Sequence, residues 1–261
     1  MKVLRALLGC AALGCALLWV PPQGARTSAA TLGPGERGAG ASIRERVEFV
    51  FRSENPAHAN AMLAELWTRR GSAADPLEAE TIDGLARDVI RVRNERAVGR
   101  LRLADRYRSF LGSIADGASW SDWAYGVPAS ITMAQAILES GWGKAAPGHN
   151  YFGMMGDGPA GHTVITSVDY RGGKRRVLAR RLKAFESPAQ AMEAHGRLLG
   201  TSHRYTDARA HATDPATFAR RLQGTYASDP RYAARLMEIV DGCGLVAFDV
   251  EQPTAWDPTS G

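Results

Sequence analysis

The sequence predicts an α+β fold that is mainly helical and carries one small β-hairpin lobe. Apolar residues recur at helical spacing along most of the chain, and several of these segments begin with Ser or Asp followed directly by Pro. Residues 162–185 alone combine β-branched side chains with a Gly-Gly turn, the pattern of a hairpin. With 45% hydrophobic and 23% charged residues, a chain of 261 residues can bury an ordinary core in one or two domains.

The first 30 residues are typical of a signal peptide. Two basic residues precede an apolar run at residues 7–20, and the small residues at 28–30 suit cleavage. The run is shorter than the roughly 20 residues of a spanning helix. An uncleaved anchor and lipidation at Cys15 remain alternatives, although the residues before Cys15 match a lipoprotein signal poorly. We therefore expect a protein that is secreted, periplasmic or held in the cell envelope, with membrane attachment only through this segment.

A Gly-rich linker is expected at residues 31–41, and a helical segment follows at 42–104. Ser42, Pro56 and Asp75 mark three helix starts. The third helix has a heavily charged face, which is more often solvated than a binding site. The pattern leaves three roles open for this segment: a helical cap, an interaction arm, or an extension packed against the next domain.

Residues 127–156 combine an apolar helix with a loop rich in Gly and aromatic residues. On a helical wheel the apolar residues share a broad face, whereas Gln135 and Glu139 lie on a narrow polar stripe. Glu139 would occupy the last turn, where the helix dipole and the nearby Trp142 disfavour its ionised form. An isolated helix Glu is usually solvated, but a raised pKa here would suit a general acid near neutral pH.

The runs AQAILESGWG at 134–143 and NYFG at 150–153 closely resemble the catalytic-helix signature of glycoside hydrolase family 73. These enzymes are bacterial peptidoglycan N-acetylglucosaminidases, and they include flagellar-type wall hydrolases and autolysins. The hairpin sequence and the run TYASDPRYA at 225–233 resemble two further family motifs in the same order. The resemblance covers residues 105–248, with a tail at 249–261. It implies a lysozyme-like domain that cleaves the β-1,4 bond after N-acetylglucosamine in peptidoglycan.

The resemblance assigns the general acid to Glu139 and places Tyr226 in the active site. A second carboxyl would come from Asp169, on the first strand of the hairpin, where the family often has Glu. Asp is one methylene shorter, so an ordinary solvated acid remains the alternative. A mechanism that uses the acetamido group of the substrate needs no second carboxyl.

Several residues around these motifs are candidates for substrate binding. Gln135 lies one turn before Glu139 and would position the acid. Asn150 would hold either the loop or the acetamido group of the sugar, and Phe152 has core packing as its alternative. Tyr232, inside the last motif, is expected to be a core residue. The predicted substrate-binding residues are Gln135, Trp142, Asn150, Tyr151 and Phe152.

The first helix of this domain is expected to end at Gly117. Three aromatic residues follow before the apolar helix: Trp120, Trp123 and Tyr125. Flat rings can stack on sugar faces, but tryptophan is also a common core residue, so both interpretations stay open.

The last third of the chain has three further helix starts in which Ser or Asp precedes Pro. These starts are Ser187, Asp214 and Asp229. Cys243 would be the one cysteine left after signal cleavage, which excludes an intramolecular disulfide in the mature chain and favours a packed residue.

The net charge of +5 and a pI near 9.3 favour acidic partners. Seven basic residues at 171–183 would either attract anionic cell-wall polymers or form a solvated face. Nucleic acid is disfavoured because no aromatic residues interleave with this run and the chain is expected to be exported. The six histidines lack ligand spacing, and no phosphate loop or GxSxG motif occurs, so we expect no metal and no cofactor.

Two alternatives to a glucosaminidase remain at this stage. Muramidases and lytic transglycosylases use the same fold and need only one acid. A non-catalytic module that binds the cell wall or assists assembly could also have kept the fold, although the presence of Glu139 favours an enzyme.

Overall fold

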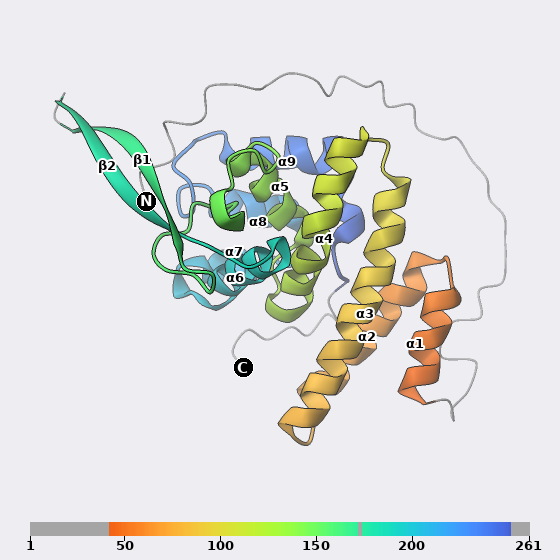
Figure 1. Cartoon of the computed structure of the whole chain (residues 1–261). Coiled ribbons are helices and arrows are strands. Elements are labelled where there is room, and N and C mark those ends of the chain that lie inside the picture. The colour runs from red at the N-terminus through yellow and green to blue at the C-terminus, as the bar shows by residue number, and fades with distance from the viewer. Residues whose placement is uncertain (1–41, 172–173, 252–261) are drawn as a thin grey trace.

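The computed structural model describes residues 42–171 and 174–251, with the side chains of 168–171 and 174–176 left out (Figure 1). The predicted signal peptide and linker lie outside the described residues. A mainly helical body carries one antiparallel hairpin, which confirms the predicted fold class. Among the described helices, none has the length and apolar character that a membrane crossing requires.

Three helices form the N-terminal segment, and each begins where a side chain accepts a hydrogen bond from the first turn. Ser42 forms the predicted capping box with Glu45, and Asn55 and Asp75 cap the next two helices. The helices are α1 (Ile43–Arg52), α2 (Pro56–Gly71) and α3 (Pro76–Arg100).

The N-terminal helices share a core with α4 (Asp105–Tyr125). Trp120 and Trp123 of α4 are buried in that core, and the Trp123 indole donates a 3.0 Å hydrogen bond to the Leu63 carbonyl. The Arg87 guanidinium lies 3.6 Å from the centroid of the Trp120 ring. Sugar stacking is therefore the wrong interpretation for these two tryptophans, and the segment is an extension packed against the next domain.

Helix α4 continues through Gly117, contrary to the predicted end at that residue. The glycine is there because α4 crosses α6 (Pro188–Thr201) at close range. A Cβ on Gly117 would lie 2.7 Å from both the Cα and the carbonyl oxygen of Ala189. The helix ends instead at Gly126, which has a left-handed φ of 64°.

Helix α5 (Ala129–Ser140) is the central helix of the domain, and its residues 129–137 are all buried. Its apolar side chains pack against α4, α8 (Pro215–Leu222), α9 (Tyr232–Cys243) and the short helix η4 (Leu245–Phe248). Burial on all sides follows from the sequence, because this helix is apolar around most of its circumference. Gly141, with φ of 60°, ends it, so Glu139 occupies the last turn as predicted.

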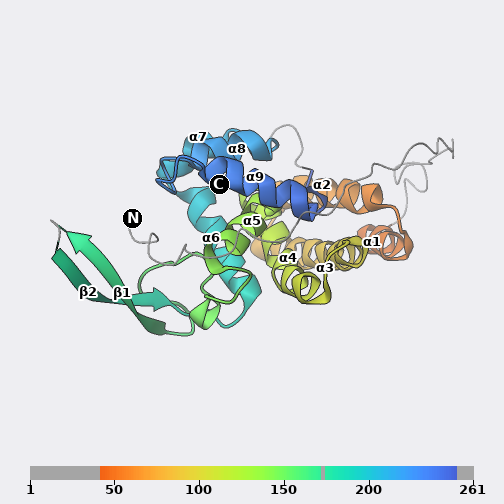
Figure 2. The ribbon, with the colours of Figure 1, turned by 90° about the horizontal axis from the view of Figure 1, so that it is seen from above.

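The predicted hairpin is formed by β1 (His162–Arg171) and β2 (Lys174–Lys183), which pair from His162 opposite Lys183 to Arg171 opposite Lys174. The loop from α5 contains the short helix η2 (Pro147–His149) and leads into β1. Figures 1 and 2 show the hairpin projecting from the helical body, with the end of β1 and the start of β2 farthest from the helices.

Helices complete the chain after the hairpin. Ser187 and Asp214 cap α6 and α8 as predicted. Helix α9 begins two residues later than predicted, with Arg231 in place of Asp229 at the cap position. Asp229 instead accepts the Arg231 N–H in a turn, and Tyr232 is the first helical residue. Cys243 is buried as the last residue of α9. Between α6 and α8 lie η3 (His203–Tyr205) and α7 (Thr206–Arg209).

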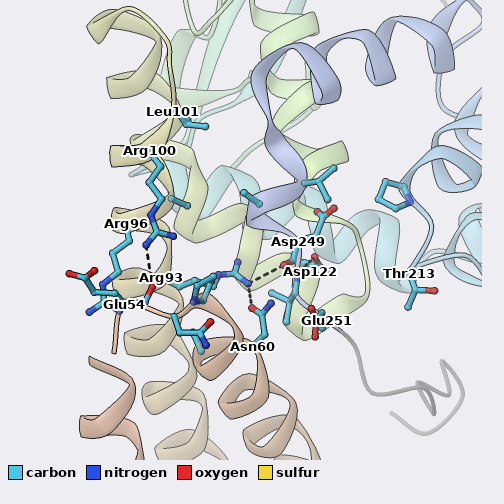
Figure 3. A pocket seen from close by; sticks show the side chains of 18 of the residues that line it. Glu54, Asn60, Arg93, Arg96, Arg100, Leu101, Asp122, Thr213, Asp249 and Glu251 are labelled. Atoms are coloured by element: carbon cyan, nitrogen blue, oxygen red, sulfur yellow. Dashed lines mark hydrogen bonds between the residues drawn. The ribbon is translucent and has the colours of Figure 1, made fainter. Parts of the chain in front are cut away.

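A buried polar network joins the N-terminal helices to the start of α5. Arg93 of α3 donates to the Asp249 carbonyl at 3.0 Å and the Phe248 carbonyl at 2.6 Å, while the Asp249 carboxylate accepts both the N–H and the hydroxyl of Ser130. Figure 3 shows Arg93 pointing toward Asp249 beside a cavity of about 690 Å³. Asp249 and the buried Val250 therefore belong to the fold and not to a loose tail.

We predict that Gly117→Ala destabilises the protein by about 1–3 kcal/mol, because the new methyl group forces α4 and α6 apart. Gly112→Ala is the matched control on the same helix, where the nearest heavy atom to a new Cβ lies at 3.8 Å. There alanine should gain up to about 1 kcal/mol from its higher helix propensity. Urea unfolding of both variants checks this, and equal stability of the two would contradict the account.

Candidate active site

Glu139 lies in the last turn of α5, half-buried between α5 and the segment that joins α8 to α9. Residues 129–137 of α5 are buried, so packing leaves the helix little freedom to move. This is the place in the chain where an acidic side chain extends from the central helix toward a cluster of tyrosines.

Two tyrosine hydroxyls enclose the Glu139 carboxyl. Tyr232 donates to Oε1 at 2.8 Å, and Tyr226 donates to Oε2 at 3.2 Å. The two phenol rings stack with centroids 5.8 Å apart. Gln135, one turn earlier on α5, donates its amide N–H to the Tyr232 hydroxyl at 2.8 Å. Tyr226 therefore contacts Glu139 directly, and Gln135 is linked to Glu139 through Tyr232.

Burial raises the pKa of Glu139 to about 8, and the hydrogen bonds from Tyr232 and Tyr226 lower it in part. Burial, together with the nearby Glu139, also holds the pKa of both phenols well above the usual value. At neutral pH the cluster therefore contains a protonated carboxyl and two neutral hydroxyls. A protonated carboxyl at this pH can donate its proton, which is the chemistry of a general acid.

Trp142 packs against the rings of α4, at the other end of a series of ring contacts that leads to the tyrosines at Glu139. Its ring centroid lies 4.4 Å from that of Tyr107 and 5.8 Å from that of Phe110. Trp142 has a left-handed φ of 64°, between two glycines that also have positive φ. The strained turn holds the half-buried indole against α4. The side chains that bond the Glu139 carboxyl are instead Tyr226 and Tyr232.

Three residues predicted to bind substrate have packing roles. The Asn150 side chain bonds the N–H and carbonyl of Met154 and the carbonyl of Lys183, so it holds the loop to β2. Tyr151 is buried with its ring edge toward Phe110. Phe152 is buried and stacks on His195 with centroids 3.8 Å apart. Their burial leaves these side chains little surface for a substrate.

His195 of α6 forms a rigid wall behind Tyr226. It is fully buried, and burial lowers its pKa to about 3, so the imidazole is neutral. Its ring lies between Phe152, in the stack just described, and Tyr226, whose ring meets it edge-on at 5.8 Å. This packing limits how far the Tyr226 ring can turn away from Glu139.

Asp169 lies on β1 opposite Arg176, two residues before the last residue of that strand, and its side chain is outside the described set. Asp169 is the seventh residue after His162, which lies at the base of the hairpin, so the two are about 23 Å apart along an extended strand. In Figures 1 and 2 the end of β1 lies away from the helices. The described geometry therefore brings Glu139 to Tyr226, and leaves Asp169 on the projecting arm.

Metal ligands form no cluster in the part of the chain that the structure describes: no group of three or more His, Cys, Asp or Glu side chains could hold an ion there. The chemistry that the described site offers is proton donation and hydrogen bonding by Glu139, Tyr226 and Tyr232.

Sequence reasoning missed Tyr232, which it assigned to the core. The residue is buried, but its hydroxyl reaches the acid. The signal was present in the motif itself, where a second tyrosine lies close to the first but at the start of the following helix. Helical periodicity identifies the face that Tyr232 occupies, yet it carries no information about which polar group of α5 meets that face.

The chain matches known proteins over the region that contains this site. The family model for glucosaminidases, described as mannosyl-glycoprotein endo-β-N-acetylglucosaminidase, matches residues 115–245. The exo-glucosaminidase LytG of Bacillus subtilis (strain 168) is 31% identical over 159 residues, 58% of this chain and 56% of the relative. A probable N-acetylmuramidase of Lactococcus lactis subsp. cremoris (strain MG1363) is 33% identical over 150 residues, 54% of this chain and 34% of the relative.

The fold also matches a solved structure. The catalytic domain of the autolysin Auto (Lmo1076) from Listeria monocytogenes has a TM-score of 0.53 at 26% identity, covering 60% of this chain and 95% of that domain. The matched region spans 56% of the length of the first relative and 34% of the second, so it corresponds to one part of those longer proteins.

We predict that the free energy of unfolding of Glu139→Gln, compared with that of wild type, increases as the pH rises. The folded carboxyl keeps its proton up to a pKa of about 8, whereas the unfolded one ionises near 4.5. Between these values unfolding releases a proton, so wild-type stability falls with pH, and glutamine cannot ionise. The shift is worth at most about 5 kcal/mol, and for a half-buried group we expect about 1–3 kcal/mol.

Urea unfolding of both proteins near pH 4 and near pH 8 provides the measurement. Taking the difference between the two proteins at each pH removes the contribution of the other titrating groups. A stability difference that is the same at both pH values would show that Glu139 ionises normally in the folded chain.

Proposed function

The chain belongs to the glucosaminidase family, glycoside hydrolase family 73, and from this premise we propose that it is a peptidoglycan hydrolase that cleaves the β-1,4 bond after N-acetylglucosamine. The observation that carries the proposal is the protonated carboxyl of Glu139 held between two tyrosine hydroxyls. Hydrolysis of a glycosidic bond requires a proton on the leaving oxygen as the bond breaks. Glu139 is the general acid in this proposal.

The two tyrosines stabilise the carboxylate that remains after the proton has been transferred. After Glu139 has given its proton to the leaving sugar, its carboxylate is left in a partly desolvated place. The Tyr232 and Tyr226 hydroxyls donate to its two oxygens, which stabilises that charge. Tyr226, which is half-buried, is also the hydroxyl that we propose meets the scissile sugar.

Asp169 is proposed as the second carboxyl, supplied by the hairpin. In this proposal the hairpin moves toward the helical body when a glycan lies between them, and Asp169 then activates water or balances the positive charge on the sugar. The basic residues of the hairpin, including Arg180 and Arg181 on β2, would attract anionic wall polymers. The proposed place of action is the cell wall, after export.

A muramidase is the second candidate, favoured by the N-acetylmuramidase among the relatives. Both bonds lie in the same polymer, and both reactions use one general acid. The bond cleaved depends on which sugar stands on each side of Glu139, and the described acid cluster suits either arrangement. The glucosaminidase is preferred because the family model and LytG carry that name.

We predict that the wild-type protein digests purified peptidoglycan and that Glu139→Gln lowers turnover by about 100-fold or more, because glutamine has no acidic proton. Glu238→Gln, an exposed acid on α9, is the matched control and should retain activity. Equal digestion by wild type and Glu139→Gln would remove the enzymatic proposal. Mass spectrometry of the products then identifies the bond: reducing N-acetylglucosamine ends support a glucosaminidase, reducing muramic acid ends a muramidase, and anhydromuramic ends a transglycosylase.

We further predict that Asp169→Asn lowers turnover at least about tenfold, because the amide cannot act as a base or balance positive charge. Glu186→Gln, an exposed acid just after β2, is the control for a general change of charge near the hairpin. Initial rates on the same peptidoglycan provide the comparison. Turnover equal to that of wild type would assign Asp169 to the solvent and leave a substrate-assisted mechanism.

A further inference from the structure

We propose that Tyr232 and Gln135 are a pair of positioning residues that keep the acidic proton of Glu139 on one particular oxygen, Oε2, which faces Tyr226. The inference rests on the proposed function, because it specifies which atom of the general acid delivers the proton. It gives different roles to two tyrosines that both contact the same carboxyl.

The direction of the Tyr232 hydroxyl is set by Gln135. A phenol hydroxyl has a single hydrogen to donate, and its oxygen can also accept a hydrogen bond. The Gln135 amide nitrogen lies 2.8 Å from the Tyr232 oxygen and can only donate, so the phenol hydrogen is left for Glu139 Oε1, also at 2.8 Å. The Gln135 Oε1 atom has no partner among the described residues, so the bond to Tyr232 is the one that orients the amide.

Burial makes this arrangement hard to reverse. Gln135 is fully buried and Tyr232 is 4% exposed, so solvent offers little alternative bonding to either group. Hydrogen bonds in such surroundings are stronger than in water, and breaking one leaves a costly unpaired group. Tyr232 is therefore a fixed donor to Oε1.

A fixed donor on Oε1 places the acidic proton on Oε2. If Oε1 carried the proton, two hydrogens would lie between Oε1 and the Tyr232 oxygen, and one bond would be lost. Tyr226 has no such restriction, because its hydroxyl makes one hydrogen bond among the described residues, the 3.2 Å contact with Oε2. It can accept from the protonated Oε2 and donate to the same oxygen once the proton has left.

The reaction step follows from this difference. The glycosidic oxygen approaches Oε2 and takes the place of Tyr226 as the acceptor. The proton passes from Oε2 to that oxygen while the bond to the anomeric carbon breaks, and its electron pair goes to the leaving hydroxyl. Tyr226 then turns to donate to the carboxylate. Water adds its oxygen to the anomeric carbon, and the proton that this water loses restores the acid.

Titration of Glu139 in the free protein tests the pair without any need for substrate. Carbon-13 NMR of the labelled carboxyl gives its pKa in wild type, Tyr232→Phe, Gln135→Met and the double variant. Tyr232→Phe removes a donor to the carboxylate, so its pKa should rise by about one unit or more. Gln135→Met should raise it less, because Tyr232 remains but becomes free to accept from Oε1.

The double variant separates a positioning pair from two independent residues. Because Gln135 acts through Tyr232, the double variant should titrate like Tyr232→Phe alone. Tyr151→Phe, a buried tyrosine whose hydroxyl makes no hydrogen bond to Glu139 in the described structure, is the control and should leave the titration unchanged. An unmoved titration in Tyr232→Phe, or additive shifts in the double variant, would overturn the inference.

Activity gives a second readout. The alkaline limb of the kcat/KM profile should move upward with the NMR value in Tyr232→Phe, while a variant with only a structural defect would lose activity at all pH values. If the titration shifts as expected but the wild type does not digest peptidoglycan, the proposed function fails and the proton placement stands. If digestion occurs and the titration does not move, the reverse holds.

Discussion

The enclosure of one carboxyl at the end of a buried helix is the constraint on which the rest of this structure depends. A charged carboxylate there costs free energy, so burial raises the pKa of Glu139 to about 8 and the carboxyl keeps its proton at neutral pH. The cost is limited because each oxygen of the Glu139 carboxylate accepts a hydrogen bond from a tyrosine hydroxyl. Tyr226 and Tyr232 lie 87 and 93 residues further along the chain, so the acid is completed only when the last third of the domain has packed onto α5.

The same helix must also be held at its start, and this explains the N-terminal segment. Asp122 of α4 accepts the Ala129 N–H, and Asp249 accepts that of Ser130, so two carboxyls satisfy the first turn of α5. Arg93 of α3 in turn holds the backbone around Asp249. The segment at 42–104 thus contributes no acid, yet it helps to fix the helix whose other end carries Glu139.

Local chemistry was readable from the sequence, and long-range contact was not. Ser187 and Asp214 cap helices as predicted, because a cap involves only neighbouring residues. Gly117 was misread because a glycine that ends a helix and a glycine that admits another helix look alike in sequence. Tyr232 lies in the core as expected, but its hydrogen bond to Glu139 was not foreseen, because periodicity does not identify the element that it meets. For Asn150 the sequence left two alternatives open, and its bond to the Lys183 carbonyl supports the one in which it holds the loop. The acid itself was predictable because an apolar helix with one carboxyl is unusual within a short window.

The neutral state of all three groups in the acid cluster limits what the cluster can do after the proton has moved. Glu139 starts as a protonated acid, so it is not the nucleophile of a double displacement. The tyrosines have pKa values well above the usual range, so neither supplies a negative charge to the sugar. In the proposed reaction, the positive charge that develops at the anomeric carbon is therefore stabilised from outside the cluster, by a carboxyl on the hairpin or by the acetamido group of the substrate. The proposed mechanism thus separates two tasks in space: the fixed helical body supplies the proton, and a group on the projecting hairpin or on the glycan itself stabilises the positive charge.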